Sequence, residues 1–475
     1  LNINLGSGGE SFLITSTHGG ATVLNSNGGS DTINVQGSAG TMTVNAGVGG
    51  DTINVQAIGG ATTVNAGAGN DTINVGSLAP NGNGNVNGLN GLLTINGDND
   101  SDTLNVDDSG DTTANSGTLT DMALTGLGIS QGIVYGAVEA LTISLGSGGD
   151  TFTIASTHLG TTQLNTNGGD DTVNVRSIAG ATTINAGLGD DTMNVGSLAP
   201  QLGSGVPGTP DPEGQSQGNA SGGGDVNGIN ALLTVNGGGN SDTLYVDDTG
   251  EIDPNNGTLT ATTLTGLGMA QGIVYGTLEA LNIGLGLGGD TFTIVSTHTG
   301  ATTIETQDGD DTINVLSTSG VTTIDAGADH DTINVRAIGG ATTVNAGAGA
   351  DTVNVGSLAP ASGGNVNAIN ALLTVNGDGE SDTLNVDDTG DVLGNNGTLT
   401  ATALTGLGMA QGIVYGTLET LNIGLGSGGD NFTIASTHNG VTVLNSNSGS
   451  DTINVRSTDG ATTINAGAGA DTINV

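Results

Sequence analysis

The feature that most constrains the fold of this chain is a unit of 20 residues in which apolar and polar residues alternate. The pentapeptide Asp-Thr-Ile-Asn-Val opens the unit, for example at Asp31 and again at Asp51, and its isoleucine and valine share one face of an extended chain. A glycine turn at 59–60 leads to a second alternating run at 63–66. Two short strands per unit, stacked in register, predict an all-β fold: a parallel β-solenoid with about 20 residues per coil.

A longer repeat is superimposed on this unit. The tripeptide Ser-Thr-His occurs four times, and successive copies are 140 residues apart. In the second super-repeat a Pro/Gly-rich loop, 201–225, replaces one coil, and we expect this loop to be an exposed excursion. We expect one continuous solenoid. Its super-repeats are 1–149, 150–289, 290–429 and the partial 430–475.

Each super-repeat ends in a divergent block, such as 242–289, with more large apolar residues. Leu281 and Ile283 alternate there and predict a thicker core layer. Tyrosine recurs in this block every 140 residues, first at Tyr135, and phenylalanine follows it, first at Phe152. Because only 2% of the residues are aromatic, we expect these rings to fill the core, with a stacking surface for sugars as the alternative.

The charge balance excludes several classes of function. The formal net charge is −43, and the chain contains three arginines, no lysine and no cysteine. Nucleic acids and anionic membrane surfaces both attract proteins through cationic side chains, so neither is an expected partner. No apolar run approaches the ~20 residues of a membrane span. Solenoid enzymes that cleave anionic polysaccharides need basic grooves, so we expect no enzymatic activity and no catalytic residues.

An aspartate opens the strand in sixteen units. In-register stacking would bring most of these carboxylates into a file about 4.8 Å apart, the spacing of neighbouring strands. Like charges at that distance repel, and three arginines cannot neutralise sixteen acids. The positions are Asp31, Asp51, Asp71, Asp102, Asp150, Asp171, Asp191, Asp242, Asp290, Asp311, Asp331, Asp351, Asp382, Asp430, Asp451 and Asp471.

Glycines before these aspartates indicate which cation would neutralise them. Glycine lies two residues before the aspartate in twelve of the sixteen units, and in eight of those a second glycine lies four before it, as in Gly67-Ala68-Gly69-Asn70-Asp71. Glycine permits positive φ, so the loop can curl and direct its carbonyl oxygens toward the carboxylate. Several oxygen ligands on a flexible loop suit Ca²⁺ better than Mg²⁺, whereas Zn²⁺ prefers histidine or thiolate. The sixteen aspartates are therefore candidate Ca²⁺ ligands, and good turn geometry is the alternative explanation.

These turns resemble the hemolysin-type calcium-binding repeats of RTX (repeats-in-toxin) proteins, whose signature is G-G-x-G-x-D-x-U-x. The segments 47–53, 67–73, 347–353 and 467–473 match the signature from its second glycine onward. The first glycine is usually alanine, as at Ala46, and the motif occurs once per coil, whereas many family members carry it at both turns. The resemblance covers most of the chain. It implies a β-roll that binds Ca²⁺ along one edge, in a secreted protein.

The expected function is structural. We expect a calcium-stabilised extracellular or cell-surface repeat region, the stalk, extender or filament of a large adhesin-like protein, because extracellular Ca²⁺ is abundant enough to fill weak sites. Its expected partners are Ca²⁺ and other copies or neighbouring repeats of the same chain. The alternative is a self-assembling surface-layer or matrix filament bridged by Ca²⁺. A third hypothesis is an ice- or glycan-binding surface, because threonine and asparagine form regular outward files.

Three further features leave alternatives open. The histidines of the Ser-Thr-His copies are expected to be polar turn residues, with a lateral contact to a neighbouring solenoid as the alternative. Asn219-Ala220-Ser221 and Asn256-Gly257-Thr258 are glycosylation sequons, which are frequent by chance. A second acidic group could bind further ions or form solvated turns. Its members are Asp107-Asp108, Asp247-Asp248 and Asp387-Asp388.

Overall fold

The structure is a computed structural model that describes residues 1–201 and 223–475. It forms two compact units, each described separately below. The first comprises Leu1–Pro200, Val226–Leu244 and Met269–Leu278. The second comprises Tyr245–Gly268, Glu279–Val475 and the described residues of Gln201–Asp225. Most of the predicted excursion 201–225 and the sequon at Asn219 lie outside the described residues.

The described residues form β-strands joined by turns and loops. Those of the first unit are β1 (Asn2–Asn4), β2 (Ser11–Ile14), β3 (Thr22–Asn25), β4 (Thr32–Val35), β5 (Met42–Val48), β6 (Thr52–Val55), β7 (Thr62–Ala68), β8 (Thr72–Val75), β9 (Leu93–Asn99), β10 (Thr103–Asp107), β11 (Ser116–Leu119), β12 (Ala123–Gly126), β13 (Ile129–Gly136), β14 (Ala140–Ser144), β15 (Thr151–Ile154), β16 (Thr161–Asn165), β17 (Thr172–Val175), β18 (Thr182–Leu188), β19 (Thr192–Val195), β20 (Leu233–Gly239) and β24 (Ile273–Gly276). β21 (Thr243–Asp247) contains residues of both units.

The second unit repeats the same kinds of strand. They are β22 (Asn256–Leu259), β23 (Thr263–Gly266), β25 (Ala280–Gly284), β26 (Thr291–Ile294), β27 (Ala301–Glu305), β28 (Thr312–Val315), β29 (Thr322–Asp325), β30 (Thr332–Val335), β31 (Thr342–Asn345), β32 (Ala348–Gly349), β33 (Thr352–Val355), β34 (Leu373–Asn376), β35 (Gly379–Glu380), β36 (Thr383–Asp387), β37 (Asn396–Leu399), β38 (Ala403–Gly406), β39 (Ile413–Gly416), β40 (Thr420–Gly424), β41 (Asn431–Ile434), β42 (Val441–Asn445), β43 (Thr452–Val455), β44 (Thr462–Asn465) and β45 (Thr472–Asn474).

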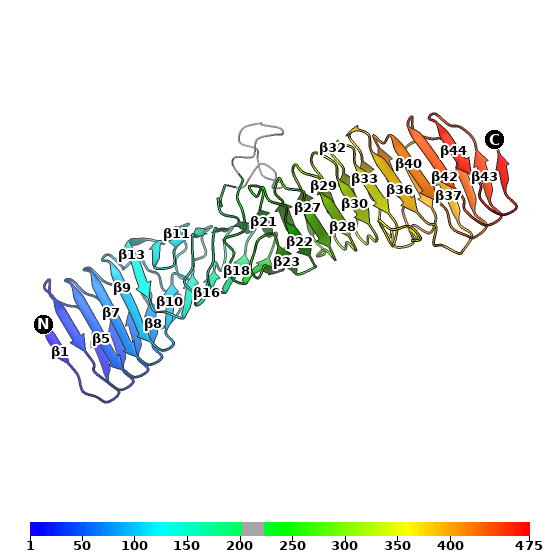
Figure 1. The fold of residues 1–475 in the computed structure, drawn as a ribbon. Coiled ribbons are helices and arrows are strands. Elements are labelled where there is room, and N and C mark those ends of the chain that lie inside the picture. The colour runs from blue at the N-terminus through cyan, green and yellow to red at the C-terminus, as the bar shows by residue number, and fades with distance from the viewer. Residues whose placement is uncertain (202–222) are drawn as a thin grey trace. The chain divides into compact units, whose positions relative to one another are not determined.

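Within each unit the coils stack in parallel and in register, as the 20-residue repeat predicts (Figure 1). In the first unit β4, β6 and β8 pair so that Ile33, Ile53 and Ile73 lie directly above one another. All three side chains are fully buried. The alternation of apolar and polar residues thus sends one file of each strand into a continuous core and the other outward. The predicted parallel β-solenoid with two strands per coil is confirmed.

The outward asparagines form hydrogen-bonded ladders along both sheets. In the first unit the Nδ2 of Asn65 donates to the Oδ1 of Asn45 at 2.7 Å, and the Nδ2 of Asn96 donates to the Oδ1 of Asn65 at 2.6 Å. On the opposite sheet Asn74 donates in the same way to Asn54 at 2.9 Å. Each amide side chain therefore ties its coil to the next, which only in-register stacking allows.

Each divergent block inserts an antiparallel hairpin into the parallel stack. In the first unit β11 pairs antiparallel with β12, and β12 pairs antiparallel with β13. The outer strands of this insertion rejoin the stack, because β13 pairs in parallel with β9 and β11 with β15. In the second unit β37, β38 and β39 repeat the arrangement. The sequence analysis predicts a thicker core layer here but not the change of strand direction.

The hairpin also exchanges the roles of the two sheets. The aspartate-opened strands β8 and β10 pair in sequence, and β10 then pairs with β14, which pairs with β16. β16 is the second, threonine-rich strand of its own coil, whereas the next aspartate-opened strand, β15, joins the opposite sheet. In the second unit β36, β40 and β42 make the same exchange. Phe152 and Phe432 are fully buried beside these switches, as predicted for the aromatic residues.

Candidate metal centre: the aspartate ladders

The predicted aspartates contact one another through the backbone of adjacent coils. The Oδ1 of Asp51 accepts the backbone N–H of Asp31 at 2.7 Å, and the Oδ1 of Asp71 accepts the N–H of Asp51 at 2.7 Å. Asp102 accepts the N–H of Asp71 at 2.8 Å. Each aspartate sits where the chain enters a strand and its own N–H has no strand partner, so the carboxylate of the next coil satisfies it.

All sixteen predicted aspartates occupy this position, but they form four ladders and not one file. The members are Asp31, Asp51, Asp71 and Asp102 in the first, Asp150, Asp171, Asp191 and Asp242 in the second, Asp290, Asp311, Asp331, Asp351 and Asp382 in the third, and Asp430, Asp451 and Asp471 in the fourth.

The ends of the ladders involve residues that the sequence analysis missed. The N–H of Asp102 donates to the Oε2 of Glu139 at 2.8 Å, and the N–H of Asp382 donates to Glu419 in the same way. At the other end the first carboxylate of a ladder accepts an asparagine N–H, as Asp150 does from Asn115 at 2.7 Å. The 140-residue spacing of these glutamates is the signal that would have found them.

The expectation of one metal-binding edge also needs correction. In the first unit the strands of the first ladder belong to the sheet of β4, β6 and β8, whereas those of the second belong to the sheet of β15, β17 and β19. The antiparallel hairpin between them, at 116–136, exchanges the sheets. Ladders in successive super-repeats of one unit therefore open strands of different sheets.

The ladder carboxylates are buried without a compensating charge. Asp31 is 2% exposed and Asp102 is fully buried, and only the terminal Asp471 is partly exposed. In most members Oδ1 takes the hydrogen bond, and Oδ2 is buried with no hydrogen-bond partner among the described residues. These Oδ2 atoms belong to Asp31, Asp51, Asp71, Asp102, Asp171, Asp191, Asp290, Asp311, Asp331, Asp351, Asp382, Asp430 and Asp451.

Burial raises the pKa of these carboxyl groups above the ordinary aspartate range. Burial is the main cause for Asp71, where neighbouring ladder charges add to it and the pKa reaches about 6. Burial likewise raises the pKa of Asp171 to about 7 and that of Asp331 to about 8, although the backbone N–H bond opposes the shift. A buried carboxylate whose pKa is this high binds either a proton or a metal cation more readily than an exposed one.

The arginines give these ladders little neutralisation. Arg176 donates its Nε–H to the carbonyl oxygen of Ala199 at 2.5 Å, and Arg336 donates to the carbonyl of Ala359 at 2.8 Å. Gln56 makes the equivalent bond in the first super-repeat, to Ala79 at 2.8 Å. A neutral amide performs the same task, so the role of these arginines is to hold a loop and not to balance charge.

The glycines of the motif are required by close contact between coils. Gly67 has φ of 109° and Gly69 has φ of 124°, both in the region that favours glycine. A Cβ on Gly67 would lie 1.9 Å from the carbonyl oxygen of Gly47, and one on Gly69 would lie 2.1 Å from that of Gly49. Backbone carbonyl oxygens therefore stack at this turn, beside the strand entry where Asp71 is buried.

The donor set fits a hard divalent cation. It consists of oxygen atoms only, and it includes buried carboxylate oxygens that lack a partner, as Ca²⁺ sites require. Within the described parts of the chain, no group of three or more histidine, cysteine, aspartate or glutamate side chains is arranged to hold one ion. An ion at a ladder would therefore take part of its shell from backbone carbonyls or water, with the sixteen aspartates as its carboxylate ligands.

The second acidic group holds loops in place. Asp107 accepts the N–H of Gly84 at 2.8 Å through Oδ2, and Asp108 accepts the N–H of Val86 at 3.0 Å. Asp387 and Asp388 accept equivalent bonds in the second unit. Burial is the main cause that raises the pKa of Asp108 to about 7. These contacts give the group a structural role, and its use as a further ion site stays a prediction.

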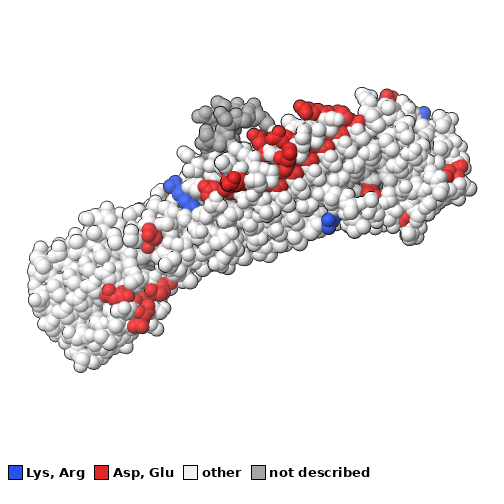
Figure 2. Space-filling view, viewed as in Figure 1, with Lys and Arg blue, Asp and Glu red and all other residues white. Residues whose placement is uncertain are grey.

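Other acidic residues gather on the surface of the second unit. Figure 2 shows them over the region of β27 and β29. Glu305 ends β27 and lies opposite Asp325 of β29 in the strand register. These two acids replace the asparagines found at the same ladder positions in the other super-repeats, for example Asn165 and Asn185, whose amides bond at 2.8 Å.

The histidines differ among the copies. His18 is at a turn, where its Nδ1 accepts the N–H of Gly20 at 2.8 Å. His158 and His438 are half-buried, and burial lowers the pKa of both. Each packs edge-to-face against a tyrosine, as in the pair of His158 with Tyr135, whose ring centres are 5.9 Å apart. They are therefore more enclosed than the predicted polar turn residues.

No protein-family model matches this chain, and no curated protein is significantly similar to it. Among the described residues, no helix has the length and apolar character needed to cross a membrane.

Proposed function

We propose that this chain is a calcium-stabilised structural repeat region of an extracellular or cell-surface protein, serving as a stalk or extender. Its aspartate ladders would bind Ca²⁺, as the resemblance to RTX repeats implies. A solenoid whose coils are tied by in-register strands and side-chain ladders transmits load along the stack. Millimolar Ca²⁺ outside cells would occupy sites that stay empty in the cytosol, so folding would follow export.

One observation carries this proposal: the ladders bury carboxylates that the chain leaves without a counter-charge. Asp51, Asp71 and Asp331 are at most 2% exposed, and each has a buried Oδ2 with no hydrogen-bond partner. Burying unpaired charges costs several kcal/mol each, at about the scale of a whole domain's net stability when summed over a ladder. A divalent cation that binds only the folded chain would offset this cost by linkage.

The test compares the folded chain in 5 mM Ca²⁺ with the chain in excess chelator. We expect circular dichroism to show β-structure with Ca²⁺ and its loss, or a melting temperature lower by tens of degrees, with chelator. Asp71→Asn keeps an acceptor for the Asp51 N–H but removes the charge, so it should weaken Ca²⁺ stabilisation. Asp459→Asn, at an exposed acid outside the ladders, should have no effect.

Full β-structure and an unchanged melting temperature in chelator would contradict the proposal. Sedimentation velocity in Ca²⁺ separates the stalk from the alternative of a self-assembling surface-layer or matrix filament. A stalk segment stays monomeric as Ca²⁺ rises, whereas a calcium-bridged filament protein associates.

A further inference from the structure

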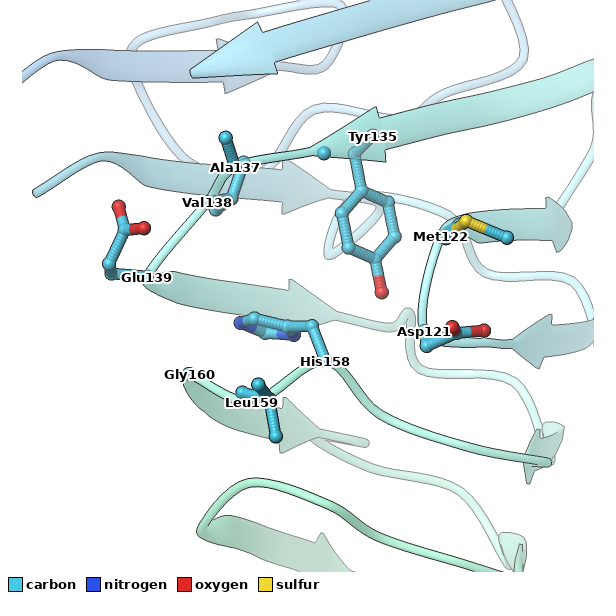
Figure 3. Close-up of a pocket in the computed structure, with 10 residues that line it drawn as sticks. Asp121, Met122, Tyr135, Ala137, Val138, Glu139, His158, Leu159 and Gly160 are labelled. Carbon is cyan, nitrogen blue, oxygen red and sulfur yellow. The ribbon is translucent and has the colours of Figure 1, made fainter. Parts of the chain in front are cut away.

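One concavity of the first unit lies outside the aspartate ladders. It has a volume of about 490 Å³, within the range of about 300 to 1,000 Å³ that is typical of ligand pockets. Figure 3 shows the Tyr135 side chain extending from β13 toward the turn that carries Asp121 and Met122, with His158 beside it. The lining comes from three segments, 121–122, 135–139 and 158–160.

The inner wall of this pocket is aromatic and held in place. Tyr135 is only 3% exposed, and its hydroxyl donates to the carbonyl oxygen of Thr120 at 2.6 Å. His158 meets the tyrosine ring edge-on, with an interplanar angle of 87°. The Nε2 of His158 is buried and has no hydrogen-bond partner among the described residues. Burial lowers the pKa of His158, so the wall carries no positive charge at neutral pH.

The rim combines exposed apolar side chains with acids. Leu159 is 88% exposed and Met122 is 61% exposed, which is unusual for large apolar residues on a solenoid turn. The charge of Asp121 adds to burial in raising the pKa of Tyr135, so this carboxylate lies close to the tyrosine hydroxyl. Glu139 supplies a second carboxylate on the other side of the tyrosine (Figure 3).

The repeat itself shows that this rim is not needed for folding. In the third super-repeat the inner wall is the same, and Tyr415 and His438 pack at 6.0 Å and 86°. The rim positions there hold Ala401, Thr402 and Asn439 in place of aspartate, methionine and leucine. The first pocket has therefore gained an acid and two exposed apolar side chains on an unchanged frame.

We infer that this pocket binds a basic side chain of a partner protein, with arginine preferred over lysine. The aliphatic stem of arginine would lie against Met122 and Leu159, and the guanidinium would face the carboxylate of Asp121. Arginine suits the site because its weakly hydrated planar cation packs on aromatic rings as well as pairing with a carboxylate. A chain of net charge −43 also attracts basic partners over distance.

The test uses methyl-¹³C-methionine NMR on the folded chain in Ca²⁺ buffer. Met122 is one of five methionines, so its methyl group reports on the pocket while the other four serve as internal controls. The probes are N-acetyl-arginine amide and its neutral isostere N-acetyl-citrulline amide. We expect the arginine probe to shift the Met122 signal saturably, with half-saturation in the millimolar range, and the citrulline probe to bind at least fivefold more weakly.

Two variants give the first pocket the rim of the third super-repeat. Asp121→Ala and Leu159→Asn each change an exposed residue and should leave the circular dichroism unchanged while weakening arginine binding at least fivefold. Equal binding of citrulline, or unchanged arginine binding by Asp121→Ala, would overturn the inference. Stronger binding of a lysine probe than of arginine would overturn the stated preference. None of these outcomes depends on whether the ladders bind Ca²⁺.

Discussion

The acidic pair on β27 and β29 allows a quantitative prediction about the side-chain ladders. Glu305 and Asp325 lie opposite each other on neighbouring parallel strands, where the corresponding residues of the fourth super-repeat, Asn445 and Asn465, share an amide bond of 2.7 Å. Burial, with the charge of Asp325 as a second cause, raises the pKa of Glu305 to about 7. Replacement of Glu305 by asparagine removes one charge and matches the residue of the other super-repeats.

The expected gain follows from the strand spacing. Two carboxylates about 4.8 Å apart, at an effective dielectric constant of about 40 to 80, repel each other by about 1 to 2 kcal/mol. Glu305→Asn should therefore slow hydrogen exchange in β27 and β29 about 5- to 30-fold at pH 8. Asp325→Asn should give a similar gain. The double variant should gain little more than either single one, because the first substitution already ends the repulsion.

The pH dependence fixes the sign of the argument. A carboxyl group whose pKa is raised by folding stabilises the folded state below its unfolded pKa, and this contribution is lost as pH rises through its folded pKa. For Glu305 that window runs from about 4.5 to about 7. The gain in exchange protection should thus be largest at pH 8 and absent at pH 5, at one fixed Ca²⁺ concentration. Strictly additive single variants, or a gain that persists at pH 5, would refute the reasoning.

Three further predictions test the coil geometry. Gly67→Ala should lower the melting temperature, with a local cost of at least about 2 kcal/mol because a Cβ there meets a carbonyl oxygen at positive φ, whereas Gly136→Ala, with open space around it, should not. Asn65→Ala should cost about 1 kcal/mol in local exchange protection, because its amide bonds to both neighbouring coils. Arg176→Gln should leave the melting temperature unchanged, since Gln56 makes the same loop bond, whereas Arg176→Ala should lower it.

The regular part of the fold is predictable from sequence because the pattern is both local and repeated. The alternation of Ile53 and Val55 with polar residues fixes which face is buried, and the 20-residue interval fixes the register. The burial of Tyr135 and Phe152 follows from the scarcity of aromatic residues. These inferences need no knowledge of contacts between distant residues.

The antiparallel hairpins are not predictable in the same way. Strands β11 and β12 have the same composition as parallel strands, and their direction depends on the turn at 120–122 and on which strands have free edges. The exchange of sheets follows from this hairpin, so it was also missed. For the candidate site, the sequence identified every ladder aspartate, because the motif is local. It did not identify Glu139, which closes a ladder across 37 residues of intervening chain.

The exchange of sheets at each hairpin gives a super-repeat a parity. Where a 140-residue period ends in such a switch, as at β10–β14 and at β36–β40, the motif-bearing strand passes from one side of its unit to the other. Duplication of one period would then present everything beyond it in mirrored order of faces, whereas duplication of two periods would restore the original order. A lineage that lengthens such a chain can thus keep a face-specific contact only by adding periods in pairs.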